Sequence, residues 1–173
     1  MLRQLQNAAV PAGAVGTEID PETLSSEVVR QGYAYWLARR GTRAFPARTE
    51  IRPADIKSVL PHIILAKVLD GGADFQFRVV GEAVAEAHGL NPINWRVSEL
   101  DRHAAGFSSA VMPAYRRVFE TGRPYASRGT LKHLDRGYRG FETVILPLGP
   151  VSVDHLLVIA GFYGEEGAVP ARV

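Results

Sequence analysis

The feature that most restricts how this chain folds is a β-hairpin pattern near its middle. Residues 62–69 form a short, apolar, β-branched run, and the Asp-Gly-Gly at 70–72 supplies the residue types of a tight turn. Residues 75–79 then alternate apolar and polar side chains, with the period of a half-buried strand. The alternation predicts that three side chains share the buried face: Phe75, Phe77 and Val79. This stretch therefore predicts an antiparallel hairpin.

Helical segments and further strands follow the hairpin. Residues 82–88 predict one or two helical turns, and residues 104–121 predict a longer helix with apolar side chains three and four positions apart. Three more strands are predicted at about 125–131, 138–146 and 155–162. This order predicts an α+β fold, a five-stranded antiparallel sheet with a helical insert after the second strand. The insert covers one face of the sheet, and a cavity can form between them.

A further helix is predicted before the sheet. Asp20-Pro21-Glu22 has the residue types of a helix start, and Gly41 suits a helix end. We expect four regions: a flexible lead-in at 1–20, an N-terminal helix at 21–41, the main domain at 42–163 and a flexible tail at 164–173. The helix is apolar on more than one side, so it must pack on its own domain or on a second copy. We expect a homodimer formed through three of its side chains: Tyr33, Trp36 and Leu37.

Composition argues against several classes of partner and chemistry. The chain has 20 basic and 18 acidic residues, and its arginines are spread out rather than clustered, so nucleic-acid binding is not expected. No apolar run is long enough to span a membrane, and the N-terminus lacks the pattern of a signal peptide. The absence of cysteine excludes thiol catalysis, iron–sulfur clusters and a flavin–cysteine adduct. We therefore expect a cytoplasmic protein without a membrane partner.

No arrangement of residues predicts catalysis or metal binding. The five histidines lack the spacing of metal ligands. The sequence also contains neither a Gly-x-Ser-x-Gly motif nor a glycine-rich phosphate loop. We therefore expect no catalytic residue and no metal site, and the residues identify no cofactor.

Several stretches of the chain together resemble a PAS domain. They are Gly32-Tyr33-Ala34-Tyr35-Trp36, residues 74–81 (DFQFRVVG), Ser98-Glu99-Leu100, Gly122-Arg123-Pro124 and residues 141–148 (FETVILPL). The resemblance covers about residues 24–163 and is in particular to short, stand-alone bacterial PAS-like proteins with an added N-terminal helix. It implies a sensory or interaction module that binds a small molecule or cofactor between sheet and helices, or that dimerises and docks partners, usually without catalysis.

The resemblance also implies where a ligand would lie. The predicted site combines the inner face of the sheet with the helical insert, and its residues are Phe77, Val79, His88, Trp95, Tyr115 and Phe141. His88 ends the first helix of the insert, where a polar ligand contact or a haem ligand lies in such proteins. Arg96 and Arg128 are the candidates for binding an acidic group of a ligand.

The expected function is that of a non-catalytic sensor or adaptor in bacterial signalling, which binds a small ligand or a protein partner. The chain shows no kinase, cyclase or DNA-binding segment, so its output is expected to pass through a protein partner. Two alternatives remain open. One is a small α+β-barrel enzyme of the isomerase or cyclase type, which an Asp or Glu beside a histidine in the pocket would favour. The other is an interaction domain with a filled core and no ligand.

Overall fold

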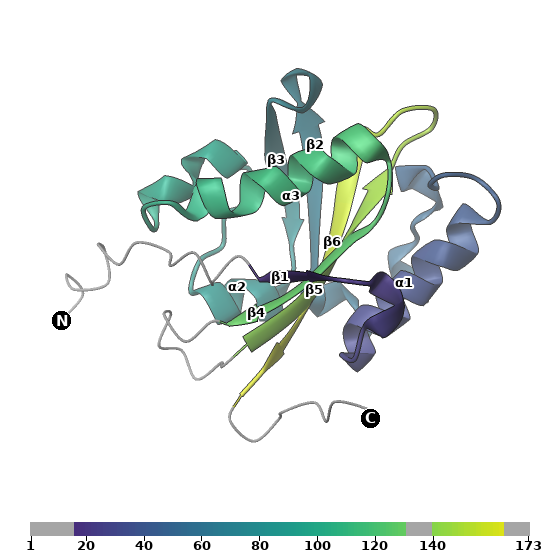
Figure 1. The fold of residues 1–173 in the computed structure, drawn as a ribbon, viewed down its shortest axis with the longest axis horizontal. Coiled ribbons are helices and arrows are strands. Elements are labelled where there is room, and N and C mark those ends of the chain that lie inside the picture. The colour runs from purple at the N-terminus through teal and green to yellow at the C-terminus, as the bar shows by residue number, and fades with distance from the viewer. Residues whose placement is uncertain (1–15, 131–139, 165–173) are drawn as a thin grey trace.

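A computed structural model describes residues 16–130 and 140–164. Its centre is an antiparallel sheet with the strand order β1-β4-β5-β6-β2-β3 (Figure 1). The strands are β1 (Thr17–Ile19), β2 (Ile63–Leu69), β3 (Asp74–Val80), β4 (Tyr125–Thr130), β5 (Gly140–Leu148) and β6 (His155–Tyr163). The predicted α+β fold is confirmed, with helices inserted between β3 and β4. The sheet has six strands rather than five, because Thr17–Ile19, inside the predicted lead-in, pairs with β4.

The helices lie on both faces of the sheet. On one face are α2 (Glu82–His88), the 3₁₀ helix η7 (Val97–Arg102) and α3 (Phe107–Thr121). On the other face, α1 (Glu27–Arg40) packs on β5 and β6 (Figure 1). The domain is therefore built of three layers, with the insert on one side of the sheet and the N-terminal helix on the other.

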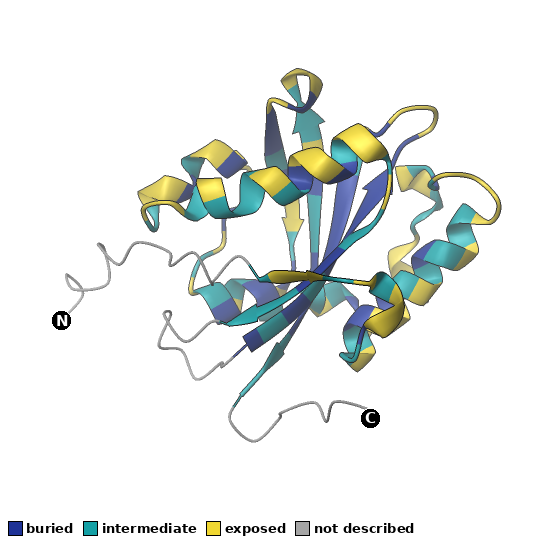
Figure 2. Cartoon of the chain, viewed as in Figure 1, coloured by how far each residue is buried: buried dark blue, intermediate teal, exposed yellow. Residues whose placement is uncertain are grey.

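Two apolar cores separate these layers. On β5, Val144 and Leu146 pack with the α1 side, whereas Ile145 packs with the insert side. On β6, Leu157 packs with the α1 side and Leu156 packs with the insert side. Side chains of a strand alternate between its faces, so a strand covered on both faces is apolar at nearly every position. Figure 2 shows the result, a sheet whose central strands are buried along most of their length.

The N-terminal helix starts later than its sequence predicts. Asp20 accepts a hydrogen bond from the backbone N–H of Glu22 at 2.9 Å, but it caps only a short 3₁₀ turn, Pro21–Thr23. The α-helix itself begins at Glu27. It ends as predicted at Gly41, whose φ of 57° favours glycine and whose N–H donates to the carbonyl of Leu37.

Trp36 is part of its own domain's core, so it is not free to contact a second copy. Its side chain is 0% exposed, and its indole N–H donates to the carbonyl of Pro147 at 3.0 Å. The prediction that Trp36 belongs to a dimer interface is therefore wrong. The apolar α1 is accommodated by the second face of its own sheet. Tyr33 and Leu37 are half-buried against the same core.

Candidate functional site

A cavity of about 170 Å³ lies between the sheet and the helical insert. The sheet contributes side chains from β2 to β6, and the insert contributes side chains from α2, η7 and α3. Most of the wall is apolar, including Ile64, Val84 and Val111. Four of the six predicted ligand-site residues line it: Phe77, His88, Tyr115 and Phe141.

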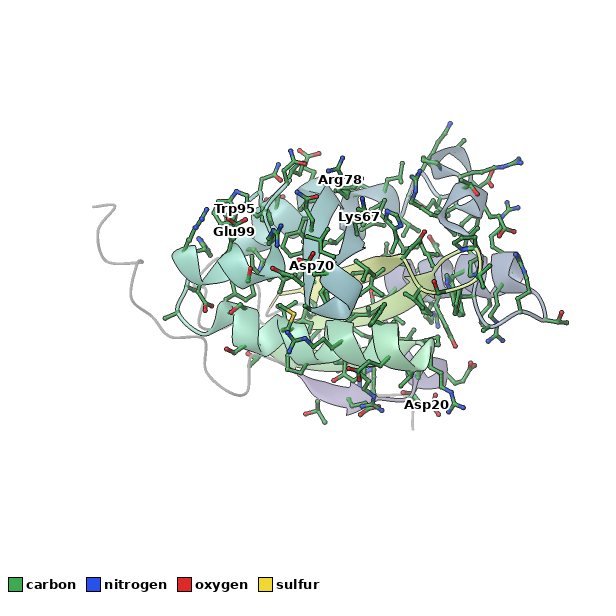
Figure 3. The ribbon with its side chains drawn as sticks, turned by 90° about the horizontal axis from the view of Figure 1, so that it is seen from above. Asp20, Lys67, Asp70, Arg78, Trp95 and Glu99 are labelled. Carbon is green, nitrogen blue, oxygen red and sulfur yellow. The ribbon has the colours of Figure 1, made fainter. Side chains whose placement is uncertain are left out.

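Val79, by contrast, lies outside the cavity and is 40% exposed. The cause is a β-bulge in the hairpin, where Leu65 pairs with Val79 but the next residue, Ala66, pairs with Phe77. Arg78 is thus an extra residue in β3, and it extends with Lys67 into solvent (Figure 3). The bulge changes which side chains face inward, so Val80 lines the cavity in place of Val79.

Trp95 also lies outside the cavity, beyond the edge of β3 (Figure 3). Its backbone carbonyl accepts a hydrogen bond from the N–H of Phe77 at 3.0 Å, and the N–H of Asn94 donates to the carbonyl of Phe77 at 2.7 Å. These bonds hold the segment against the edge strand, with a bridge between Gln76 and Arg96. The Trp95 ring is half-buried against the core from outside the site.

His88 closes one end of the cavity as the last residue of α2. Its imidazole lies 5.7 Å from the ring of Phe107 on α3 and 5.9 Å from the ring of Phe162 on β6, measured between ring centroids. Phe162 pairs across the sheet with Phe141, which also lines the cavity. This end of the site is therefore built from aromatic rings.

Polar side chains line the cavity in the row of the sheet next to Phe141. Ser127 on β4 pairs with Thr143 on β5, and both line the cavity. The Thr143 hydroxyl donates to the carbonyl of Ile159 at 3.0 Å. Ser127 is only 2% exposed. Sequence reasoning missed both residues, although the strand period places Thr143 on the same face as Phe141.

Two tyrosines complete the polar part of the wall. Tyr115 on α3 is 4% exposed, and the ring of Phe75 packs edge-on against it at 5.4 Å. Burial raises the pKa of Tyr115 far above its usual value. Burial, with a smaller contribution from the charge of Glu18, also raises the pKa of Tyr125. Both phenols are therefore protonated at neutral pH.

The two arginines proposed for an acidic ligand group lie elsewhere. Arg128 is on the α1 face of β4, where its Nε donates to the carboxylate of Glu142 at 3.0 Å. Arg96 lies at the exposed edge beside Asp70, with 3.4 Å between Nη1 and Oδ2. The sequence interpretation of Arg128 and Arg96 as ligand contacts is therefore not supported by their positions.

Glu142 is a buried carboxylate that the sequence analysis did not identify. It accepts hydrogen bonds from the backbone N–H groups of Ser25 and Ser26 at 2.9 and 2.8 Å, where α1 begins. Burial raises its pKa, but hydrogen bonds from Arg128, Ser26 and Ser25 outweigh burial, so the net pKa is lowered. Glu142 therefore anchors the N-terminal helix to the sheet.

Within residues 16–130 and 140–164, no three His, Asp or Glu side chains come close enough together to hold a metal ion. No helix in the same ranges is long and apolar enough to cross a membrane.

Comparison with known proteins supports the architecture described above. The sequence model of the PAS domain family matches residues 18–160, which is most of the chain. A comparison with curated proteins finds no match. PAS domains are sensor and signalling-type domains that are generally non-catalytic. The match confirms the resemblance seen in the sequence motifs, and the fold agrees with it, so the chain belongs to the PAS domain family.

Proposed function

We propose that the protein is a non-catalytic sensor that binds a small molecule in the cavity between the sheet and the insert. The observation that carries the proposal is the cavity itself, about 170 Å³ with mostly apolar walls and a few converging hydroxyls. This combination is typical of small-molecule sites. Binding there would change the packing of the insert, and we propose that a protein partner detects this change.

The enzyme alternative finds less support in the cavity wall. Among the described residues that line the cavity there is no Asp and no Glu. General acid–base catalysis needs groups placed to move a proton to and from a substrate. A wall of apolar side chains and protonated hydroxyls supports binding better than it supports turnover.

The ligand-free alternative is disfavoured by small side chains in the wall. Ala110 and Ala114 of α3 and Ala160 of β6 all line the cavity. A protein used only as an interaction surface would gain stability from larger side chains here, at roughly 1 kcal/mol for each buried methyl group. Small residues at three positions around one cavity therefore support the proposal that the empty volume is kept for a ligand.

The test compares the full-length chain with a variant whose cavity is filled. Ala114→Leu adds methyl groups on the cavity wall, and Ala38→Leu makes the same change at an exposed position of α1. Toluene titration followed by ligand-observed NMR should show saturable binding to wild type and to Ala38→Leu, but not to Ala114→Leu. Native mass spectrometry of freshly purified wild type should also show a bound small molecule. Absence of saturable toluene binding, or equal binding by Ala114→Leu, would overturn the proposal.

A further inference from the structure

The cavity wall carries enough polar detail to indicate the chemical class of its ligand. We infer that the cavity takes an uncharged molecule, about the size of one ring with a small substituent, whose oxygen-bearing group forms hydrogen bonds with Ser127 and Tyr115. This inference rests on the proposed function, because it assumes that the cavity is a ligand site.

The first observation is the hydroxyl of Ser127. Among the described residues, three polar side chains are buried, namely those of Asp74, Ser127 and Glu142. Asp74 accepts a hydrogen bond from the hydroxyl of Ser98 at 2.6 Å, and Glu142 is fully engaged with Ser25, Ser26 and Arg128. Ser127, at 2% exposure, has no side-chain hydrogen bond to any residue in the described part of the chain. Because Ser127 lines the cavity, its hydroxyl is available to form a hydrogen bond with a ligand placed there.

The second observation concerns Tyr115, which lines the cavity from α3, opposite the sheet. It is 4% exposed, and its hydroxyl likewise forms no hydrogen bond with the residues that the structure describes. Burial keeps this phenol protonated, so it can donate to a carbonyl or hydroxyl oxygen. One hydroxyl from the sheet and one from α3 thus offer two hydrogen bonds to a molecule placed between them.

The charges around the cavity decide between neutral and ionic ligands. No Lys, Arg, Asp or Glu occurs among the described residues that line it. Tyr115 and Tyr125 are protonated, and the imidazole of His88 lies beside the rings of Phe107 and Phe162. A carboxylate or an ammonium group placed beside Ser127 and Tyr115 would lose its hydration without an oppositely charged Lys, Arg, Asp or Glu in the described wall. The wall therefore favours a neutral molecule.

The size of the cavity sets the last limit. An apolar cavity of roughly 150 Å³ in another protein holds a benzene molecule. At about 170 Å³, this cavity has room for one ring and a small oxygen-bearing group. Haem and flavin are much larger than a benzene ring and do not fit the cavity in this form.

Three probes of similar shape test the inference on the full-length chain at neutral pH. Acetophenone carries a neutral oxygen, toluene carries none, and benzoate carries a negative charge. Acetophenone should bind roughly three- to tenfold more tightly than toluene, because it accepts hydrogen bonds from the two hydroxyls. Benzoate should bind at least about tenfold more weakly than acetophenone, because its charge is desolvated without compensation.

Two variants show whether the named hydroxyls are responsible. Ser127→Ala and Tyr115→Phe should each lower the affinity for acetophenone by about three- to tenfold and leave the affinity for toluene unchanged. Unchanged toluene binding also shows that each variant is folded. Ser58→Ala and Tyr35→Phe make the same chemical changes on the α1 side of the domain and should alter neither affinity.

The outcomes separate this inference from the proposed function. If toluene binds but acetophenone binds no more tightly, or if the hydroxyl variants bind acetophenone like wild type, the inference is overturned and the cavity remains a ligand site. Tighter binding of benzoate than of acetophenone would also overturn it. If toluene does not bind, the proposed function fails as well.

Discussion

The guanidinium of Arg128 and the carboxylate of Glu142 meet across β4 and β5, with 3.0 Å between Nε and Oε2, on the sheet face turned away from the cavity. Their neighbours Ser127 and Thr143 point into the cavity. The same two strands therefore supply part of the cavity wall on one face and the anchor of α1 on the other.

We predict that Glu142→Gln destabilises the protein by about 2 kcal/mol, because it removes the charge that accepts hydrogen bonds from Arg128, Ser25 and Ser26. Urea unfolding followed by circular dichroism measures this free energy. The matched control is Glu27→Gln, which alters an exposed pair with Arg30 and should leave the unfolding midpoint unchanged. Equal effects of the two substitutions would contradict the role of Glu142.

The lowered pKa of Glu142 predicts a pH dependence of stability. Its folded pKa lies below the unfolded value of about 4.5, so the stabilising effect is complete above that pH and is lost as the pH falls through the folded pKa. Wild type should therefore lose more thermal stability on acidification than Glu142→Gln does. Melting temperatures of both proteins from pH 6 down to about pH 3 measure this difference. Parallel curves would show that Glu142 does not contribute.

Close packing of α1 on β6 predicts an effect at Gly32. A Cβ at this position would come within 2.2 Å of the Cδ1 atom of Ile159, which is fully buried. Gly32→Ala gains up to about 1 kcal/mol of helix propensity but loses roughly 1–3 kcal/mol through overpacking, so we expect a net loss of stability. Ile159→Val removes the clashing atom and should make Gly32→Ala less harmful in a double-mutant cycle. If the effects of the two substitutions were simply additive, α1 would lie farther from β6 than the structure shows.

The bulge at Arg78 predicts that substitutions of the adjacent valines, Val79 and Val80, cost unequal amounts of stability. Val80→Ala removes methyl groups from the cavity wall and should cost about 1–2 kcal/mol of stability. Val79→Ala changes a side chain that is 40% exposed and should cost less than about 0.5 kcal/mol. Chemical denaturation of both variants compares the two positions. The reverse order would mean that the hairpin pairs without the bulge.

The proposed homodimer now rests on Tyr33 and Leu37, because Trp36 is enclosed. Tyr33 stacks on the Trp36 ring with 6.2 Å between centroids and keeps part of its surface exposed. Light scattering should therefore show a dimer for wild type and a monomer for Tyr33→Lys. Val151→Lys, at a loop position that is 92% exposed, serves as the control and should stay dimeric. A monomeric wild type would end this proposal.

Local patterns predicted the hairpin, the insert and the last three strands, because turn residues and alternation lie within each segment. Two predicted strand ends lie outside the described residues. They are the end of the strand predicted at 125–131 and the start of the strand predicted at 138–146. The bulge at Arg78 was not predictable, since it depends on how β3 pairs with β2. β1 was missed because three residues are too few to show a period, and their pairing with β4 joins distant parts of the chain.

Residues that line the cavity were predicted where strand period and helix spacing decide their position, and missed where tertiary contacts decide it. Phe77, Tyr115 and Phe141 follow the period of their elements and line the cavity. Trp95 was misplaced because its backbone pairs with β3, which no local pattern reveals. Glu142 looks like an ordinary exposed strand residue until Ser25 and Arg128 are brought to it from elsewhere in the chain.

The segment around Trp95 also affects how the sheet meets other proteins. Unpaired strand edges are templates on which another chain can add a strand, and this leads to aggregation. Residues 94–96 occupy part of the free edge of β3, and the opposite edge is formed by β1, which has only three residues. Within the described residues, neither edge offers a long row of free backbone groups. We therefore expect any protein partner to recognise side chains on the helices and loops, which would make the interaction specific to sequence rather than to backbone.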